Sequence, residues 1–166
     1  MSTAISQVQD AGSALLKLRE MLVLSFTLAE SGGAFVLVCE FPEKAPGSSR
    51  AFARCRFSGV REFVREPGDL KRLGPFGPTY SLRSTSHSIV IESIKLDVDD
   101  SRREIDLWFG WNFGGVRFKY DSVVVHTRDT KAVKHNNGEE RWDYLDFKSG
   151  DPLDFREPFH DDDTRG

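Results

Sequence analysis

Apolar and polar residues alternate along most of this chain, and a period of two predicts β-strands. Residues 22–41 form a predicted hairpin, because two alternating runs there flank the turn residues Ser31-Gly32-Gly33. A third strand is predicted over 51–57, after a loop rich in Pro, Gly and Ser. The alternation returns in the second half of the chain, in the segments 89–98, 105–111, 116–120 and 123–126. The sequence therefore predicts antiparallel β-structure.

The two ends of the chain have different patterns. Apolar residues recur every three to four positions over 3–20, which predicts an N-terminal helix. Asn136-Asn137-Gly138 is a strong turn sequence, and it predicts a C-terminal hairpin whose return strand covers 140–147. The last residues, 149–166, lack periodicity and are expected to be extended, with Phe155 and Phe159 as the anchors.

The two halves of the chain show an internal similarity. A shift of 70 residues places the apolar positions of the first hairpin on those of 94–111 without a gap. A shift of 63 then places the third strand on 118–123. Any two amphipathic meanders share a period of two, so a coincidence of pattern and a duplication both account for this similarity.

These patterns predict a mainly β fold, with α+β as the alternative. We expect two related three-stranded antiparallel units, which form a sandwich or one curved sheet, with an N-terminal helix and a C-terminal hairpin. The expected organisation is a single β-rich domain over 1–148, with an internal duplication of 22–60 and 92–125. Residues 149–166 are expected to form an acidic C-terminal tail.

The length of 166 residues fits one domain, and the net charge of -3 conceals an uneven distribution. Residues 43–83 contain nine basic and four acidic residues, whereas 139–166 contain ten acidic and four basic ones. Either the acidic end is solvated or folds onto the basic segment, or one of these regions recruits an oppositely charged partner. No apolar stretch reaches the length of a membrane span, and no signal peptide is recognisable, so a cytoplasmic location is expected.

The sequence offers little support for catalysis, metal binding or a cofactor. Cys39 and Cys55 lie in alternating apolar runs and are expected to be buried free thiols. No two histidines have the spacing of metal ligands on one element. An enzyme would have to assemble His87 or His126 with distant carboxylates in space. We therefore predict no catalytic residues, no metal and no cofactor.

Several residues are candidates for contact with a partner. Trp108 is predicted to lie on the wetter face of its strand, where an exposed indole can anchor a protein or a sugar ring. The remaining candidates lie on or near the late hairpin: Trp142, Tyr144, Asp143, Asp146 and Asp154. Arginines interleaved with aromatics over 52–65 faintly resemble a nucleic-acid surface, but the acidic tail would compete for it, so no nucleic-acid partner is predicted.

The segments Phe57-Ser58-Gly59-Val60 and Tyr120-Asp121-Ser122-Val123, each after alternating strands, resemble a pattern of small bacterial cytosolic β-rich immunity proteins encoded beside polymorphic toxins. The resemblance covers about residues 22–126. It implies a non-enzymatic protein-binding domain that occludes a toxin, with acidic residues complementing a basic cleft. The alternatives are a small-ligand or carbohydrate-binding module that uses Trp108 and Trp111, and an enzyme with a His/carboxylate site. The sequence does not predict an oligomeric state.

Overall fold

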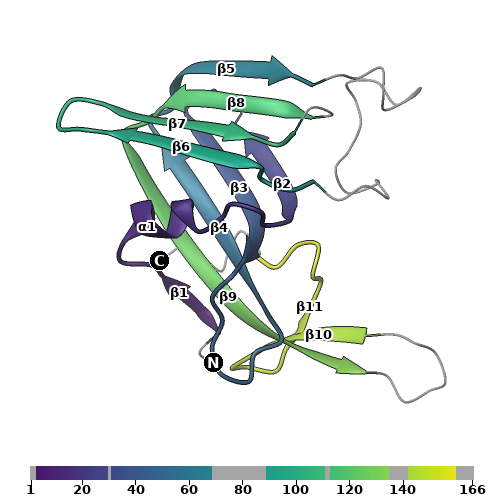
Figure 1. Ribbon diagram of the computed structural model, residues 1–166. Helices are drawn as coiled ribbons and strands as arrows, with labels where there is room; N and C mark the ends of the chain where they lie inside the picture. Colours follow the sequence, from purple (N-terminus) through teal and green to yellow (C-terminus); the bar gives the residue numbers. More distant parts are fainter. Residues whose placement is uncertain (1–2, 30, 69–88, 111–112, 135–141, 160–166) are drawn as a thin grey trace.

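The structure is a computed structural model that describes residues 3–29, 31–68, 89–110, 113–134 and 142–159 (Figure 1). It is mainly β, with one short helix, α1 (Ala11–Leu16), in the described part of the chain. The larger sheet contains β1 (Ile5–Gln7), β2 (Val23–Leu28), β3 (Ala34–Phe41), β4 (Arg50–Ser58), β9 (Ser122–Lys134), β10 (Trp142–Asp146) and β11 (Pro152–Leu153). The smaller sheet contains β5 (Arg61–Pro67), β6 (Ser93–Val98), β7 (Arg103–Trp108) and β8 (Gly114–Lys119).

Both sheets are antiparallel. The larger one is a curled half-barrel with the strand order β11-β10-β9-β4-β3-β2, and β1 pairs with β9 beside this path. The smaller one has the order β5-β8-β7-β6, and Figure 1 shows it lying across the upper ends of β2, β3 and β4. Residues 89–91 connect the two sheets, because they pair with the start of β2 before the chain enters β6.

The two predicted three-stranded units are present as antiparallel meanders, β2-β3-β4 and β6-β7-β8, and each lies in its own sheet. Two rows of paired residues occupy equivalent places: Phe26–Leu37–Cys55 and Leu96–Ile105–Phe118. These rows do not follow the gap-free shift of 70. In the first hairpin, the six residues 29–34 lie between the last two paired residues, Leu28 and Phe35. In the second hairpin, only the four residues 99–102 lie between the last two paired residues, Val98 and Arg103. The second connection is therefore two residues shorter than the first. Because two is an even number, equivalent side chains stay on the same face of their sheet, but the shift between equivalent residues changes after the turn.

The predicted N-terminal helix over 3–20 is wrong. Residues 5–7 form β1, which pairs with β9, and the helix begins only after Asp10. The Asp10 carboxylate accepts a hydrogen bond from the backbone amide of Ser13 at 2.9 Å, which is the bond of an N-cap. The apolar residues spaced three to four apart thus belong to two short elements, β1 and α1, and to the turn after α1 that contains the buried Leu18. They do not belong to one helix.

The strand β5 was not predicted. It begins directly after Gly59 and Val60, just beyond the strand predicted over 51–57. Only Phe63 of its first six residues is directed at the core, because a bulge between Arg61 and Val64 interrupts the alternation. An exposed edge strand rich in charges has no period of two that a sequence pattern could reveal.

One hydrophobic core joins the two sheets. Phe118 of β8 is buried, and its ring centroid lies 5.0 Å from that of Phe35 and 5.1 Å from that of Phe57. Leu15 and Leu18, in and just after α1, are buried in the same cluster. The contacts across the sheets show that both meanders share a single core.

The two cysteines are buried free thiols on the core face of the large sheet, as predicted. Burial raises the pKa of Cys55 to about 12 and, together with the nearby Cys55, raises the pKa of Cys39 well above its usual value. We therefore expect neither thiol to react with a water-soluble disulfide reagent at pH 8 in the native protein, since the thiolate is the nucleophile. Both should react in denaturant. Rapid reaction of either thiol in the native protein would contradict this prediction.

The residues after β10 pack on the outer face of the large sheet. β11 pairs with β10, and the Pro158 carbonyl accepts a hydrogen bond from Arg128 Nη1 at 2.9 Å. Phe52, on that outer face, is completely buried although it lies outside the main core. Residues 149–159 are thus integrated into the domain rather than extended away from it, and Phe155 does contact the domain, through Tyr144. Within the described ranges, no helix is long and apolar enough to cross a membrane.

Candidate functional site

The distal parts of β9 and β10 form a two-stranded arm, which we define as residues 131–134 and 142–145. β9 pairs with β4 only as far as Thr130, and beyond this residue its described pairing is with β10. Figure 1 shows the arm projecting at the lower right, away from the core between the two sheets. The predicted C-terminal hairpin is therefore present, although its turn, Asn136-Asn137-Gly138, lies outside the described residues.

Both faces of the arm carry a large exposed apolar side chain. Trp142 lies opposite Lys134, and Asp143 lies opposite Val133, so the two pairs are on alternate faces. Trp142 is 54% exposed and Val133 is 41% exposed. A two-stranded ribbon has little stability of its own in water, and apolar groups on both of its faces gain from being covered.

Tyr144 joins the arm to the body of the protein. Its ring lies 5.3 Å from the ring of Phe155, and the Arg50 guanidinium lies 5.8 Å from its centroid. Arg50 Nη1 also donates a hydrogen bond to the Tyr144 hydroxyl at 3.5 Å. Nearby, the exposed Asp154 carboxylate accepts a hydrogen bond from the backbone amide of Arg156 at 2.9 Å. Tyr144 is half-buried, so it supports the arm and offers only part of its ring to a partner.

Asp146 does not belong to the exposed surface, which corrects its place among the predicted contact residues. Its side chain is buried, and Arg128 Nε donates to Oδ2 at 2.8 Å. The backbone amides of Ala4, Lys148 and Ser149 donate to the same carboxylate at 2.9 to 3.0 Å. Asp146 therefore connects the N-terminal segment, β9 and the residues after β10, and it is unavailable to a partner.

The pKa of Asp146 is lower than that of an ordinary aspartate. Burial raises this pKa, but the hydrogen bonds from the amides of Ser149 and Ala4, from Arg128 and from the amide of Lys148 together outweigh it. The carboxylate is consequently ionised at neutral pH and forms a buried ion pair with Arg128.

The described arm is not acidic. Lys131 and Lys134 are exposed, and the half-buried Asp143 is the single carboxylate among residues 131–134 and 142–145. Among the other acidic residues of the hairpin and the C-terminal end, Asp151, Asp154 and Glu157 lie in the described segment after β10, whereas Glu139, Glu140 and 161–163 lie outside the described residues. An acidic contact surface therefore remains a prediction.

Trp108 lies in the smaller sheet, on β7, far from the arm (Figure 1). It is half-buried, and a Cβ atom added to Gly115 would lie 2.9 Å from its indole Cε3, so the ring packs closely on the backbone of β8. The structure thus brings Trp142, Asp143, Tyr144 and Asp154 to one end of the molecule and leaves Trp108 at the other. Trp111, the second aromatic of the ligand-binding alternative, lies outside the described residues.

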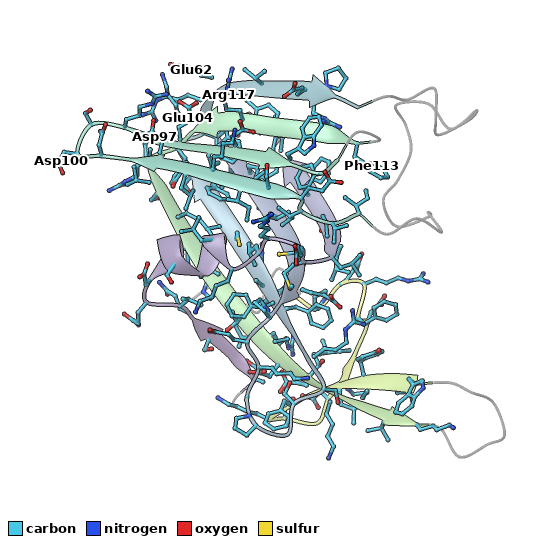
Figure 2. The ribbon with its side chains drawn as sticks, viewed as in Figure 1. Glu62, Asp97, Asp100, Glu104, Phe113 and Arg117 are labelled. Atoms are coloured by element: carbon cyan, nitrogen blue, oxygen red, sulfur yellow. The ribbon has the colours of Figure 1, made fainter. Side chains whose placement is uncertain are left out.

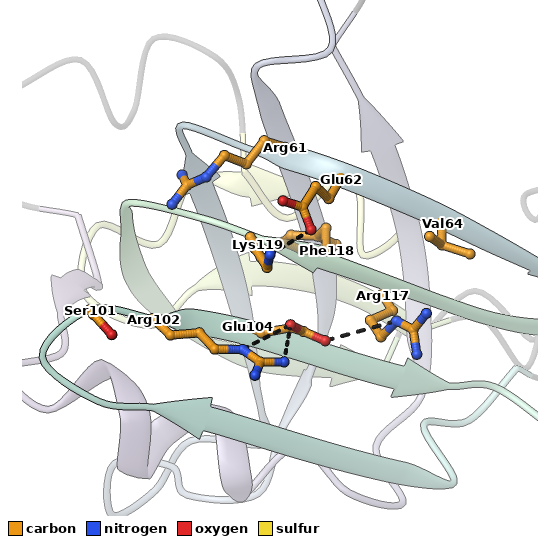
Figure 3. Close-up of a pocket in the computed structure, with 9 residues that line it drawn as sticks. All are labelled: Arg61, Glu62, Val64, Ser101, Arg102, Glu104, Arg117, Phe118 and Lys119. Carbon is orange, nitrogen blue, oxygen red and sulfur yellow. Dashed lines mark hydrogen bonds and ion pairs between the residues drawn. The ribbon is translucent and has the colours of Figure 1, made fainter.

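The outer face of the smaller sheet contains a shallow depression of about 660 Å³ (Figure 3). Its charged side chains form ion pairs with one another: Glu104 lies 2.7 Å from Arg102 and 3.8 Å from Arg117, and Lys119 lies 2.6 Å from Glu62. Figure 2 shows Glu62, Glu104 and Arg117 spread over this face, and Asp97 and Asp100 near its end at the β6–β7 turn. The lining has more basic than acidic side chains, but Arg61 and Arg102 also pair with carboxylates outside it, Asp121 at 2.5 Å and Asp97 at 3.6 Å. Each basic side chain of the depression therefore already has a carboxylate partner.

The structure gives no support to a histidine-based site in the described residues. His126 lies opposite Arg54 on the outer face of the large sheet, and burial, followed by the charge of Arg54, lowers its pKa. No carboxylate in the described ranges is hydrogen-bonded to His126, and no group of metal-ligating side chains occurs among them. His87, His135 and His160 lie outside the described residues.

No protein-family model matches the chain, and no curated protein or solved structure is significantly similar to it.

Proposed function

We propose that this protein is a non-enzymatic protein-binding domain that contacts its partner through the arm. The observation that carries the proposal is the exposure of Trp142 and Val133 on opposite faces of a projecting two-stranded ribbon. Such a ribbon can insert between two surfaces of a partner, so that both apolar side chains become buried. Tyr144 and the segment around Asp154 form the base of the same contact surface.

An immunity-like role, in which the domain occludes a bacterial toxin, is the specific form of this proposal. It is supported by the β-scaffold, in which one hydrophobic core holds the two sheets together and an arm that projects from the larger sheet can block a cleft.

We also propose that the two meanders are related by internal duplication. Their matching strand order and the two equivalent rows of paired residues support this relation.

We expect the double substitution Trp142→Ala and Val133→Ser to abolish partner binding while changing the free energy of unfolding by only about 0.5 kcal/mol, because both side chains are exposed. The measurement is co-purification from native lysate, followed by titration of the purified partner with the wild type and the variant. The matched control is Leu16→Ser, since Leu16 is 55% exposed on α1.

The control variant should bind the purified partner with unchanged affinity. A partner that binds the arm variant as tightly as the wild type would contradict the proposal. Quenching of Trp fluorescence by a sugar panel, without any protein partner, would instead favour the carbohydrate-binding alternative.

A further inference from the structure

The two edge strands of the smaller sheet, β5 and β6, differ in how they expose their backbone (Figure 1). β5 is interrupted by a bulge between Arg61 and Val64, and it ends at Pro67, which has no amide hydrogen. Bulges and prolines of this kind hinder the pairing of an edge strand with another chain. β6 has neither, because its six residues pair with β7 without a shift of register. A further strand can therefore add to β6.

The backbone groups of alternate β6 residues point to this edge. At the β6–β7 turn, the Asp99 amide donates a hydrogen bond to the Arg102 carbonyl at 2.8 Å. Hydrogen-bonded and non-hydrogen-bonded pairs alternate along an antiparallel ladder, so Asp97 and Lys95 also bond to β7 through their backbone. The residues whose N–H and C=O groups point away from β7 are Ile94, Leu96 and Val98. Among the described residues, these groups have no hydrogen-bond partner.

The sequence of β6 is complementary to itself when two copies run antiparallel. If Leu96 pairs with Leu96 of a second copy, the outward-pointing groups of both strands meet in hydrogen-bonded pairs. In this register Ile94 of one copy lies opposite Val98 of the other, and Lys95 of one lies opposite Asp97 of the other. The apolar pairs then extend the core face, on which Ile94 and Leu96 already pack, and the ion pairs form on the outer face.

Three side chains of β6 would gain partners in this arrangement. Val98 is 58% exposed, although it alternates onto the core face of the sheet. Lys95 is exposed and forms no ion pair with a described carboxylate, and Asp97 lies 3.6 Å from the exposed Arg102. Self-pairing covers Val98 with Ile94 of the second copy. It also places Lys95 and Asp97 in non-hydrogen-bonded pairs, in which opposite side chains are closest.

The helix α1 packs against β6 from the core side. Its residues Ala14 and Leu15 are buried in the same cluster as Ile94 and Leu96. An added strand would lie beyond β6 in the plane of the smaller sheet and would leave these core contacts in place.

We propose that two copies of this chain associate through β6, antiparallel and in register about Leu96, so that their smaller sheets become one continuous sheet. Addition of a strand to a sheet edge is an established mode of recognition, in which main-chain hydrogen bonds provide affinity and side chains provide specificity. A contact of this size is smaller than a standard protein interface, so the dimer should be weak and depend on concentration. The proposal does not depend on the function of the arm.

Charge variants of the full chain test both the contact and its register. In Lys95→Asp both outer positions, 95 and 97, are acidic, and in Asp97→Lys both are basic. Each variant alone would place like charges opposite each other, so it should stay monomeric where the wild type dimerises. An equimolar mixture should form a heterodimer, because every 95–97 pair then has opposite charges. Sedimentation velocity over a hundredfold range of concentration, up to the millimolar range, measures the association.

Two matched controls change the net charge by the same amounts outside β6. Lys44→Asp and Asp151→Lys alter exposed side chains, and both variants should dimerise like the wild type. The charge exchange Lys95→Asp with Asp97→Lys in one chain should also dimerise, because it restores opposite charges at both pairs. Circular dichroism of each variant checks that the fold is unchanged.

Hydrogen exchange identifies the strand that pairs. The backbone amides of Leu96 and Val98 should exchange more slowly at high than at low protein concentration, since only the dimer provides acceptors for them. Unchanged exchange of both amides, at concentrations at which the chain dimerises, would overturn the proposal.

Three sedimentation results would also overturn it. The first is a wild-type chain that stays monomeric up to the millimolar range. The second is dimerisation of Lys95→Asp and Asp97→Lys, each alone, as tight as that of the wild type, because the contact would then lie elsewhere. The third is a mixture of these two variants that does not associate although the wild type dimerises, because the register about Leu96 would then be wrong.

Discussion

Replacing Asp146 with alanine is expected to lower the free energy of unfolding by about 3–5 kcal/mol, the cost of breaking a buried ion pair by removing one partner. The variant leaves the Arg128 guanidinium buried without its carboxylate and leaves the amides of Ala4, Lys148 and Ser149 without an acceptor. Urea denaturation followed by circular dichroism measures the loss. Asp151→Ala is the control, because this aspartate is exposed, and its effect should stay within about 0.5 kcal/mol.

The same carboxylate predicts how stability depends on pH. Its folded-state pKa lies below the ordinary value of about 3.9, so its contribution is fully present above that pH and is lost as the pH falls through the folded-state pKa. The stability difference between the wild type and Asp146→Ala should therefore shrink on acidification below about pH 4. A difference that stays constant or grows below pH 4 would show that Asp146 does not act through its charge.

Truncating Phe118 to alanine is expected to cost about 3–5 kcal/mol, as for other buried phenylalanines. Phe118 projects from the smaller sheet into a cluster with Phe35 and Phe57 of the larger sheet, and its ring also stacks 5.7 Å from that of Phe63. Its removal leaves a cavity in the contact between the sheets. Differential scanning calorimetry or urea denaturation should report this loss.

Phe118→Leu should recover much of the stability, because it fills part of the cavity without a polar atom. Val64→Ala is the control on the same sheet, since Val64 is 46% exposed on β5. Equal effects of Phe118→Ala and Val64→Ala would contradict the assignment of Phe118 to the core that joins the sheets.

The meanders could be predicted from sequence because each strand has one buried face. Phe35, Leu37 and Cys39 alternate with half-buried residues, and this alternation survives in the amino-acid pattern. The N-terminal helix was wrong for a physical reason: β1 pairs with β9, whose sequence is more than a hundred residues away. Local periodicity contains no information about that partner, and three residues are too few to display a period of two.

The candidate site was only partly predictable. Trp142 and Asp143 follow a strong turn sequence, so their place on a hairpin could be inferred, but not that the hairpin projects from the body. Asp146 looked like any other acidic residue near the C-terminal end. Its burial depends on Arg128 and on the amide of Ala4, and neither partner can be deduced from the spacing of charges along the chain.

The bond between the Ala4 amide and the Asp146 carboxylate has a consequence for how the protein is made. These two groups are separated by 142 residues. The strand β1 likewise can pair only after β9 has been synthesised. On the ribosome, the N-terminal segment must remain without its native partners until residue 146 has left the exit tunnel. The first meander can pair locally much earlier, because its contacts are close in sequence, so synthesis of this protein should pass through a stage in which β2, β3 and β4 are paired while their core face is still exposed.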